Sequence, residues 1–264
     1  MEDPNPLVSG KSIAELKAHG IGTTVGVMEE ACRQLNETFI KYMKTGRPFV
    51  TLKFAQTLDG RIATSTGHSQ WISGEQSRRF AHRLRSLHDA VLVGAGTVVK
   101  DDPELTVRHV RGRNPLRIVI DPLLEIPLDA KILRDQGRAA TLVVTRPDAP
   151  PEKCRRIRAM QVGLLPFGDQ GADLFDLHPL FARLGEQRIS SILVEGGSGI
   201  ITSVLRQRLA DRVVAIIAPK MIGNGLSTVG DLGIDYMDHA LGLTFKKVSR
   251  SGPDVILDGR MTMP

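Results

Sequence analysis

The chain has 264 residues, of which 41% are hydrophobic and 24% charged, the balance of a globular protein with a sizeable core. A net charge of +6 favours anionic partners, but the basic residues are scattered and one Trp and two Tyr offer little stacking surface, which argues against nucleic-acid binding. The two cysteines are far apart in sequence and no secretory signal is present, so we expect a cytoplasmic protein with reduced thiols. The seven histidines show no metal-ligand spacing and no apolar run approaches ~20 residues, so we expect neither a metal site nor a membrane span.

Residues 1–47 contain one helical pattern, over 27–44, and no evident core of their own, so we expect a boundary near Gly46–Pro48. Beyond it, short β-branched runs recur. Most are continuous rather than alternating, which is typical of strands covered on both faces. The expected strands are 49–55, 90–94, 116–121, 141–145, 190–195, 211–218 and 253–259.

Helical patterns lie between several of these strands. The first follows Ser73 and places Phe80, Leu84 and Leu87 on one face, and Ser73 with Gln76 fits a capping box. Further helices are expected near 151–160, 174–187 and 198–208. The alternation of strands and helices predicts an α/β fold.

The end of the chain has a different pattern. Residues 243–250 and 253–259 are joined by Ser-Gly-Pro and predict an antiparallel hairpin. The expected sheet is therefore mixed and mostly parallel, with flanking helices and an antiparallel C-terminal edge.

A glycine-rich turn follows the strand that ends at Glu195. Gly197 and Gly199 precede an apolar helical pattern, and the free N–H groups of a helix N-terminus suit phosphate. The spacing is not GxGxxG, because Thr202 stands at the last position, so a ligand site and an ordinary tight turn are equally supported. Glu195 lies where ligands collect in open α/β sheets; it could move protons or only cap the glycine turn.

A second polar segment, residues 93–108, follows the strand at 90–94. Asp101 and Asp102 precede Pro103, which breaks a helix. Paired carboxylates could hold a metal or act as acid and base, but Asp-Asp-Pro is also good turn chemistry, and by itself it favours a solvated turn. No P-loop, HExxH or GxSxG motif is present to indicate another chemistry.

Five stretches, taken in order, resemble the reductase family of riboflavin biosynthesis over residues 48–264. They are LKFAQTLDGRIATSTGHSQWISG, LVGAGTVVKDDPELTVR, RIVID, LVEGGSGIITSVL and IAPKMIGNG. The resemblance implies a dihydrofolate-reductase-like fold and a homodimer. It also implies a reaction in which NADPH reduces the ribosyl side chain of 5-amino-6-(5-phosphoribosylamino)uracil to a ribityl chain.

Bacterial members of this family are often fused to an N-terminal zinc deaminase, and residues 1–47 resemble the end of such a domain followed by a linker helix. The family's HAE and PCxxxxxxPPC-type zinc motifs are missing from this sequence. We therefore expect no deaminase activity here, with the deaminase supplied by a missing N-terminal domain or by a separate chain. Residues 48–264 are the expected NADPH-dependent reductase domain.

The resemblance also assigns site residues. The catalytic candidates are Lys53, Asp101 and Glu195. The cofactor positions are Ala55, Trp71, Thr97, Asp101, Gly197, Ser198, Gly199, Ile200 and Ser203. The substrate positions are Ser69, Arg85, Leu105, Arg108 and Glu195.

Two of these residues, Arg85 and Arg108, suit the substrate's 5′-phosphate because a guanidinium binds phosphate bidentately. Without the resemblance, a surface salt bridge would be the simpler interpretation of each arginine. Arg146, after the strand at 141–145, is a candidate for the 2′-phosphate of NADPH. Pro122 stands where some family members have a hydroxyl residue near the cofactor, so this chain departs from the pattern there.

In the implied mechanism, opening of the ribose ring gives an iminium that accepts hydride. The catalytic candidates would assist this step, and the sequence does not rank them. One alternative is a reductase of the undeaminated 2,5-diamino pyrimidinone, or of another pterin-like substrate. Another is a non-enzymatic dinucleotide-binding or nucleic-acid-binding protein.

Overall fold

The computed structural model describes residues 1–168 and 176–262. The chain forms two compact units. One consists of Met1–Phe49 with Phe181–Ser190, and the other contains the remaining described residues. Within the described part of the chain, no helix has both the length and the apolar character needed to cross a membrane.

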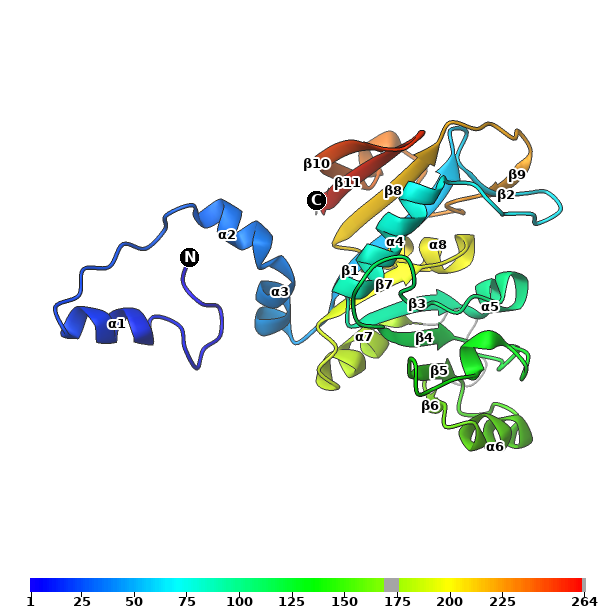
Figure 1. The fold of residues 1–264 in the computed structure, drawn as a ribbon, viewed down its shortest axis with the longest axis horizontal. Coiled ribbons are helices and arrows are strands. Elements are labelled where there is room, and N and C mark those ends of the chain that lie inside the picture. Colours follow the sequence, from blue (N-terminus) through cyan, green and yellow to red (C-terminus); the bar gives the residue numbers. More distant parts are fainter. Residues whose placement is uncertain (169–175, 263–264) are drawn as a thin grey trace. The chain divides into compact units, whose positions relative to one another are not determined.

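The smaller unit begins with the helices α1 (Lys11–Ala18), α2 (Glu29–Leu35) and α3 (Glu37–Thr45), none of which has a buried residue (Figure 1). The expectation of one helix over 27–44 is wrong, because the chain breaks at Asn36. The Asn36 side-chain amide and the Asn36 backbone N–H both donate to the Cys32 carbonyl oxygen, at 2.9 Å and 3.1 Å, where α2 ends. Later in this unit, the Tyr42 hydroxyl donates to the Gly185 carbonyl oxygen at 2.9 Å.

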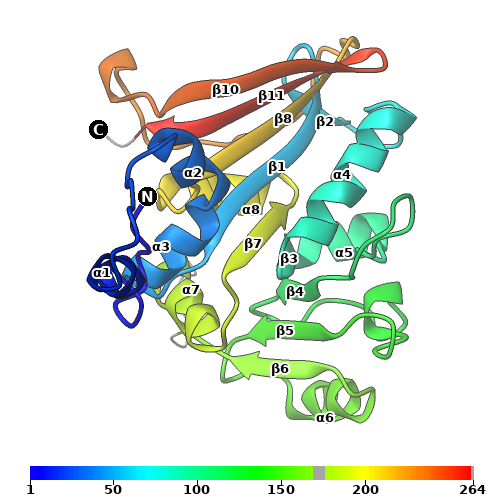
Figure 2. The same ribbon diagram turned by 60° about the vertical axis from the view of Figure 1, so that its left-hand side comes forward.

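The larger unit contains a nine-stranded sheet in the order β10-β11-β8-β1-β7-β3-β4-β5-β6 (Figure 2). Its strands are β1 (Phe49–Thr57), β3 (Ala90–Gly94), β4 (Leu116–Ile120), β5 (Thr141–Thr145), β6 (Gly163–Pro166), β7 (Ser191–Glu195), β8 (Arg212–Ala218), β10 (Gly242–Ser251) and β11 (Asp254–Thr262). Strand β8 is parallel to β1, and each neighbouring pair in the series β7-β3-β4-β5-β6 is also parallel. Strand β11 is antiparallel to β8, and β10 is antiparallel to β11. The predicted α/β class, mostly parallel sheet and antiparallel C-terminal hairpin are confirmed.

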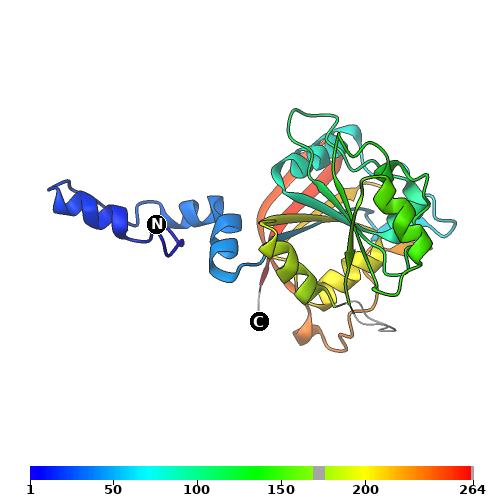
Figure 3. The same cartoon turned by 90° about the horizontal axis from the view of Figure 1, so that it is seen from below.

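The remaining helices are α4 (Glu75–Leu87), α5 (Ala95–Asp101), α6 (Pro151–Ala159), α7 (Leu177–Glu186) and α8 (Ser198–Arg206), with 3₁₀ turns η1 (Lys131–Leu133) and η2 (Met237–His239). Leu84 of α4 packs on Leu193 and Val214 of the sheet, and Ile157 of α6 packs in the cluster that contains Val91. Figure 3 shows α4 and α6 on one side of the sheet and α8 on the other. This arrangement follows from right-handed crossovers, because the chain moves outward from β1 to β6 and then returns.

Some short elements were not expected from the sequence. They are α5, β6 and a two-stranded antiparallel ribbon of β2 (Arg61–Thr64) and β9 (Gly225–Ser227). The predicted strands 49–55 and 211–218 agree with β1 and β8, and the predicted helix near 198–208 agrees with α8. Part of the helix expected over 174–187 lies outside the described residues, and α7 covers the rest of it.

The start of α4 differs from the expected capping box of Ser73 and Gln76. The N-cap is Gly74 and no side chain caps the helix. The Gly74 N–H donates instead to the carboxylate of Asp254 at 2.8 Å, which is buried at the start of β11. A residue distant in sequence thus takes the place that the local pattern gave to Gln76.

Candidate active site

A cleft of about 880 Å³ lies at the carboxyl ends of β1, β3 and β7. Lys53 and Ala55 come from β1, Gly94 ends β3, and Glu195 ends β7. One face of α4, the segment that follows β3 and the first turn of α8 complete the wall. The cleft therefore has the position at which parallel α/β sheets bind ligands.

The structure brings almost all of the sequence-predicted site residues into this one cleft. Those that line it are Lys53, Ala55, Ser69, Trp71, Arg85, Thr97, Asp101, Leu105, Arg108, Glu195, Gly197, Ser198, Gly199 and Ile200. Ser203 does not line it and accepts a hydrogen bond from the Gln207 amide at 3.2 Å. Arg146 also lies outside the lining, and its backbone N–H donates to the Pro122 carbonyl oxygen at 3.0 Å.

Glu195 is the centre of a buried ion cluster. Arg85 donates to both of its oxygens, from Nε at 2.6 Å and from Nη2 at 3.0 Å. The Lys53 ammonium lies 3.5 Å from Glu195 Oε2. The three side chains are only 9–14% exposed, so water screens these charges poorly.

This environment fixes the charge of Glu195. Burial by itself would raise the pKa of this carboxyl, but the charges of Arg85 and Lys53 and their hydrogen bonds lower it to about 2. Glu195 is consequently an anion at neutral pH and has no proton to donate. The hypothesis that it moves protons is therefore unsupported, and a fixed negative charge is the role that the geometry offers.

A second part of the cleft is the glycine turn at the start of α8. The Gly197 N–H donates to the Thr97 hydroxyl at 3.2 Å, which ties this turn to α5. A Cβ atom added to Gly199 or to Gly96 would meet no atom within 4 Å, so a ligand can approach the backbone closely at both glycines. The first N–H groups of an α-helix lack intrahelical partners, and this turn therefore fits the phosphate groups of a dinucleotide.

Trp71 forms the outer wall of the cleft and is 63% exposed. The guanidinium of Arg78 lies 4.6 Å from the centre of the indole ring, a cation–π contact. The Lys220 ammonium donates to the Trp71 carbonyl oxygen at 2.6 Å, and the Ser69 hydroxyl donates to Asp101 at 3.2 Å. An exposed flat ring on a backbone that Lys220 anchors suits stacking on a planar ligand.

The segment from Leu105 to Arg108 is held by side chains instead of by a sheet. Arg85 Nη1 donates to the Thr106 carbonyl oxygen at 3.2 Å, and the Arg108 N–H donates to His82 Nδ1 at 3.1 Å. Leu105 is buried at a backbone φ of 52°, a conformation that non-glycine residues rarely adopt. The Arg108 guanidinium pairs with the Glu104 carboxylate at 2.7 Å.

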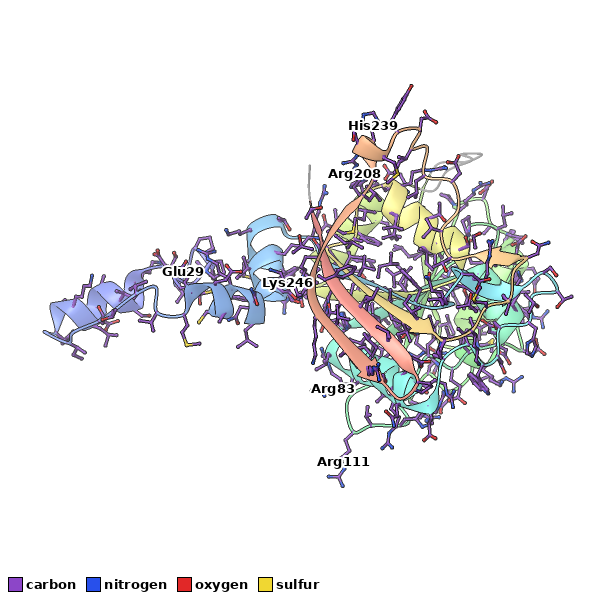
Figure 4. The ribbon with its side chains drawn as sticks, turned by 90° about the horizontal axis from the view of Figure 1, so that it is seen from above. Glu29, Arg83, Arg111, Arg208, His239 and Lys246 are labelled. Carbon is purple, nitrogen blue, oxygen red and sulfur yellow. The ribbon has the colours of Figure 1, made fainter. Side chains whose placement is uncertain are left out.

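The cleft residues outside the predicted set include two long polar side chains of α4, Arg78 and His82. With Arg85 they follow the spacing i, i+4, i+7 and so share one face of α4. That spacing was the available signal, since one helix face carried three long polar side chains. Arg83 of the same helix is exposed, and Figure 4 labels it together with Arg111 at the surface.

Among residues 1–168 and 176–262, no group of three or more His, Cys, Asp or Glu side chains could hold a metal ion. Asp101 and Asp102 are adjacent in sequence but bind different partners. Asp101 accepts from Ser69 at 3.2 Å, whereas Asp102 accepts from the Lys131 backbone N–H at 2.7 Å.

Comparison with known proteins connects this cleft to a family. The family model described as the RibD C-terminal domain matches residues 48–257. The riboflavin biosynthesis protein RibD of Aquifex aeolicus is 45% identical over 256 residues, which cover 97% of this chain and 69% of that protein. A 2,5-diamino-6-ribosylamino-4(3H)-pyrimidinone 5′-phosphate reductase of Methanothermobacter thermautotrophicus is 39% identical, over 80% of this chain and 97% of that protein.

Among solved structures, a diaminohydroxyphosphoribosylaminopyrimidine deaminase/5-amino-6-(5-phosphoribosylamino)uracil reductase from Thermotoga maritima matches with a TM-score of 0.81. It is 34% identical, and the match covers 98% of this chain and 69% of that one.

Proposed function

Because the chain belongs to the family of the RibD C-terminal domain, we propose that it is the NADPH-dependent reductase of 5-amino-6-(5-phosphoribosylamino)uracil in riboflavin biosynthesis. The single observation that carries this proposal is the anionic Glu195, buried between Arg85 and Lys53 in the wall of a cleft that also contains the glycine turn of α8. The family membership supports a reductase of this pathway, and the cleft supplies the chemistry that such a reduction needs.

Reduction at C1′ of the ribose begins with opening of the ring. The C1′–O4′ bond breaks, the nitrogen lone pair forms a C1′–N double bond, and O4′ takes up a proton. We assign that proton to the Lys53 ammonium, since Glu195 is ionised. The resulting iminium is a cation, and the fixed negative charge of Glu195 stabilises it.

The residues fit a dinucleotide cofactor. NADPH, when bound, supplies the hydride to C1′. The α8 turn from Gly197 to Ile200, with Thr97 beneath it, would hold the phosphate groups, and Trp71 would lie against the nicotinamide half. Ala55 and Asp101 complete the expected cofactor wall, while Ser203 lies outside it.

On the substrate side, Ser69, Leu105 and Arg108 line the cleft together with Arg85. Arg85 is engaged by Glu195 and by the Thr106 carbonyl, so its main task is to hold the carboxylate in place. Arg108 has the more accessible guanidinium, at 37% side-chain exposure, and is our candidate for the 5′-phosphate.

The second candidate substrate is the undeaminated 2,5-diamino compound. The Methanothermobacter relative carries this activity in its name, and the match covers 97% of that protein. The two compounds differ at C2 of the pyrimidine and share the 6-amino nitrogen bonded to C1′, so the same ring-opening chemistry would serve both substrates.

The decisive experiment follows the loss of NADPH absorbance with each pyrimidine in separate assays, with NADH as the cofactor control. Oxidation with the uracil alone supports the proposal. Oxidation with only the diamino compound assigns the enzyme to the alternative substrate, and oxidation with neither refutes a role as a pyrimidine reductase.

We further propose that residues 1–47 are the end of a deaminase domain with its linker helix, that 48–264 are the reductase domain, and that the chain acts as a homodimer. Sedimentation of the purified chain tests the dimer. Release of ammonia from the diamino compound in the presence of Zn²⁺ tests for deaminase activity, and we expect none.

A further inference from the structure

His82 is a buried histidine that the mechanism above does not use. It is on the face of α4 that also carries Arg85, it lines the cleft, and only 5% of its surface is exposed. The ring of His109, another cleft residue, meets it edge-on with the centroids 4.5 Å apart. Its position is therefore fixed from two sides.

The hydrogen bonds determine which ring nitrogen of His82 carries the proton. The backbone N–H of Arg108 donates to Nδ1 at 3.1 Å, so Nδ1 must be the acceptor. Burial, followed by the charges of Arg85, His109 and Arg108, lowers the pKa of His82 to about 4, and the ring is neutral at pH 7. A neutral imidazole with an accepting Nδ1 carries its proton on Nε2.

The Nε2–H group is the remaining donor of this ring. Within residues 1–168 and 176–262 it has no hydrogen-bond partner, and it is not among the fully buried unpartnered atoms of that part of the chain. A donor that is held in place, reached from the cleft and not paired within the protein is arranged for a ligand.

The surrounding charges indicate what kind of ligand. Arg85 and Arg108 are close enough to His82 to disfavour its cationic form, so the local field is positive and attracts an anion. Both arginines are paired, Arg85 with Glu195 and Arg108 with Glu104, but Arg108 is the more exposed of the two, at 37% against 13% of its side chain, and is therefore the more accessible cation for a ligand. The negative charge of Glu195 raises the pKa of His82, and its effect on that pKa is the smallest of those named here.

We propose that His82 is a substrate-binding residue whose Nε2–H donates to an oxygen of the substrate's phosphate group beside Arg108. This inference rests on the proposed function for the identity of the substrate, a phosphoribosyl compound. His82 thereby has two tasks, since Nδ1 holds the Arg108 backbone while Nε2 contacts the ligand.

Two substitutions separate these tasks. In His82→Asn the side-chain oxygen can replace Nδ1 as acceptor, but no donor reaches the position of Nε2. In His82→Gln the side-chain amide can replace the Nε2 donor, but the acceptor at the Nδ1 position is lost. Arg83→Gln, on the exposed face of the same helix, is the control.

We expect His82→Asn to raise the KM for the pyrimidine roughly 10- to 100-fold, the effect of losing a hydrogen bond to a charged group. The KM for NADPH and kcat should change little, because neither the cofactor wall nor the reacting atoms are touched. His82→Gln should stay closer to the wild type. A Gln variant as impaired as the Asn variant, or more impaired, overturns the proposal, as does an unchanged KM in the Asn variant.

Direct binding separates this inference from the proposed function. The probe is ribose 5-phosphate, with ribose as the uncharged control, measured by calorimetry and by nitrogen NMR of histidine-labelled wild-type protein. We expect the His82 Nε2 signal to shift with ribose 5-phosphate and not with ribose, and His82→Asn to bind the phosphate more weakly. If these results appear and no pyrimidine is reduced, the proposed function fails and the His82 inference stands. If the pyrimidine is reduced and the Nε2 signal does not respond, the His82 inference fails alone.

Discussion

Replacement of Glu195 by Gln tests the buried ion cluster most directly. The substitution keeps the shape of the side chain and removes its charge, so Arg85 and Lys53 are left as two adjacent cations with 13% and 14% side-chain exposure. Removing one partner of a buried pair costs about 3–5 kcal/mol, because the other charge stays desolvated.

The pKa of Glu195 gives a second value for the same cost. A decrease from 4.5 to about 2 corresponds to about 3 kcal/mol, at about 1.4 kcal/mol for each pH unit. Since the pKa is lower in the folded chain, the carboxylate stabilises the fold above pH 4.5, and this contribution is lost as the pH falls toward 2. We therefore expect Glu195→Gln to lower the free energy of unfolding by about 3 kcal/mol at pH 7.

Urea unfolding of the wild type and of Glu195→Gln at a series of pH values measures this difference. The difference should shrink as the pH decreases from 4.5 toward 2, because the unfolded wild type takes up a proton at this carboxyl before the folded wild type does. The control Arg83→Gln should stay within about 0.5 kcal/mol of the wild type, as exposed substitutions do. A loss below 1 kcal/mol at pH 7, or a difference that does not depend on pH, would refute the electrostatic account.

Three further outcomes are expected. Thr97→Val removes the acceptor of the Gly197 N–H and should weaken NADPH binding roughly 2- to 10-fold, measured by fluorescence titration, without changing the KM for the pyrimidine. Arg78→Met removes the cation over Trp71, and we expect the intensity or the wavelength of the indole fluorescence of the free protein to change. The KM for NADPH should rise by less than about 10-fold. Burial lowers the pKa of His88 below 6.5, so the free energy of unfolding should decrease as the pH falls from 6.5, and urea unfolding of His88→Gln should show a shallower pH dependence.

The sequence contained enough information for the sheet and for the location of most of the site. Continuous β-branched runs such as 90–94 and 116–121 mark strands covered on both faces, and this pattern is local. Glu195 and the glycines after it indicated the carboxyl end of a strand, where ligands bind. The short elements α5, β2 and β9 were missed because they have neither a continuous β-branched run nor enough turns to show a helical period.

Local capping signals were less reliable where a distant group competed. The predicted capping box failed because Asp254, on the last strand, takes the Gly74 N–H. The helix expected over 27–44 is divided at Asn36, whose side chain and backbone N–H both bond to the Cys32 carbonyl oxygen. In each case a polar side chain lies at a helix end that the local sequence pattern had not placed there.

The sequence by itself determined the main strands and helices, the family to which the chain belongs and most of the expected residues that line the cleft, because these depend on periodicity and on short motifs. Tertiary structure alone decided the charges inside that cleft. Arg85 and Glu195 are 110 positions apart, and His82 meets the backbone of Arg108 across 26 positions. Charge state depends on burial and on neighbours within a few ångströms, and only the folded chain brings those neighbours together.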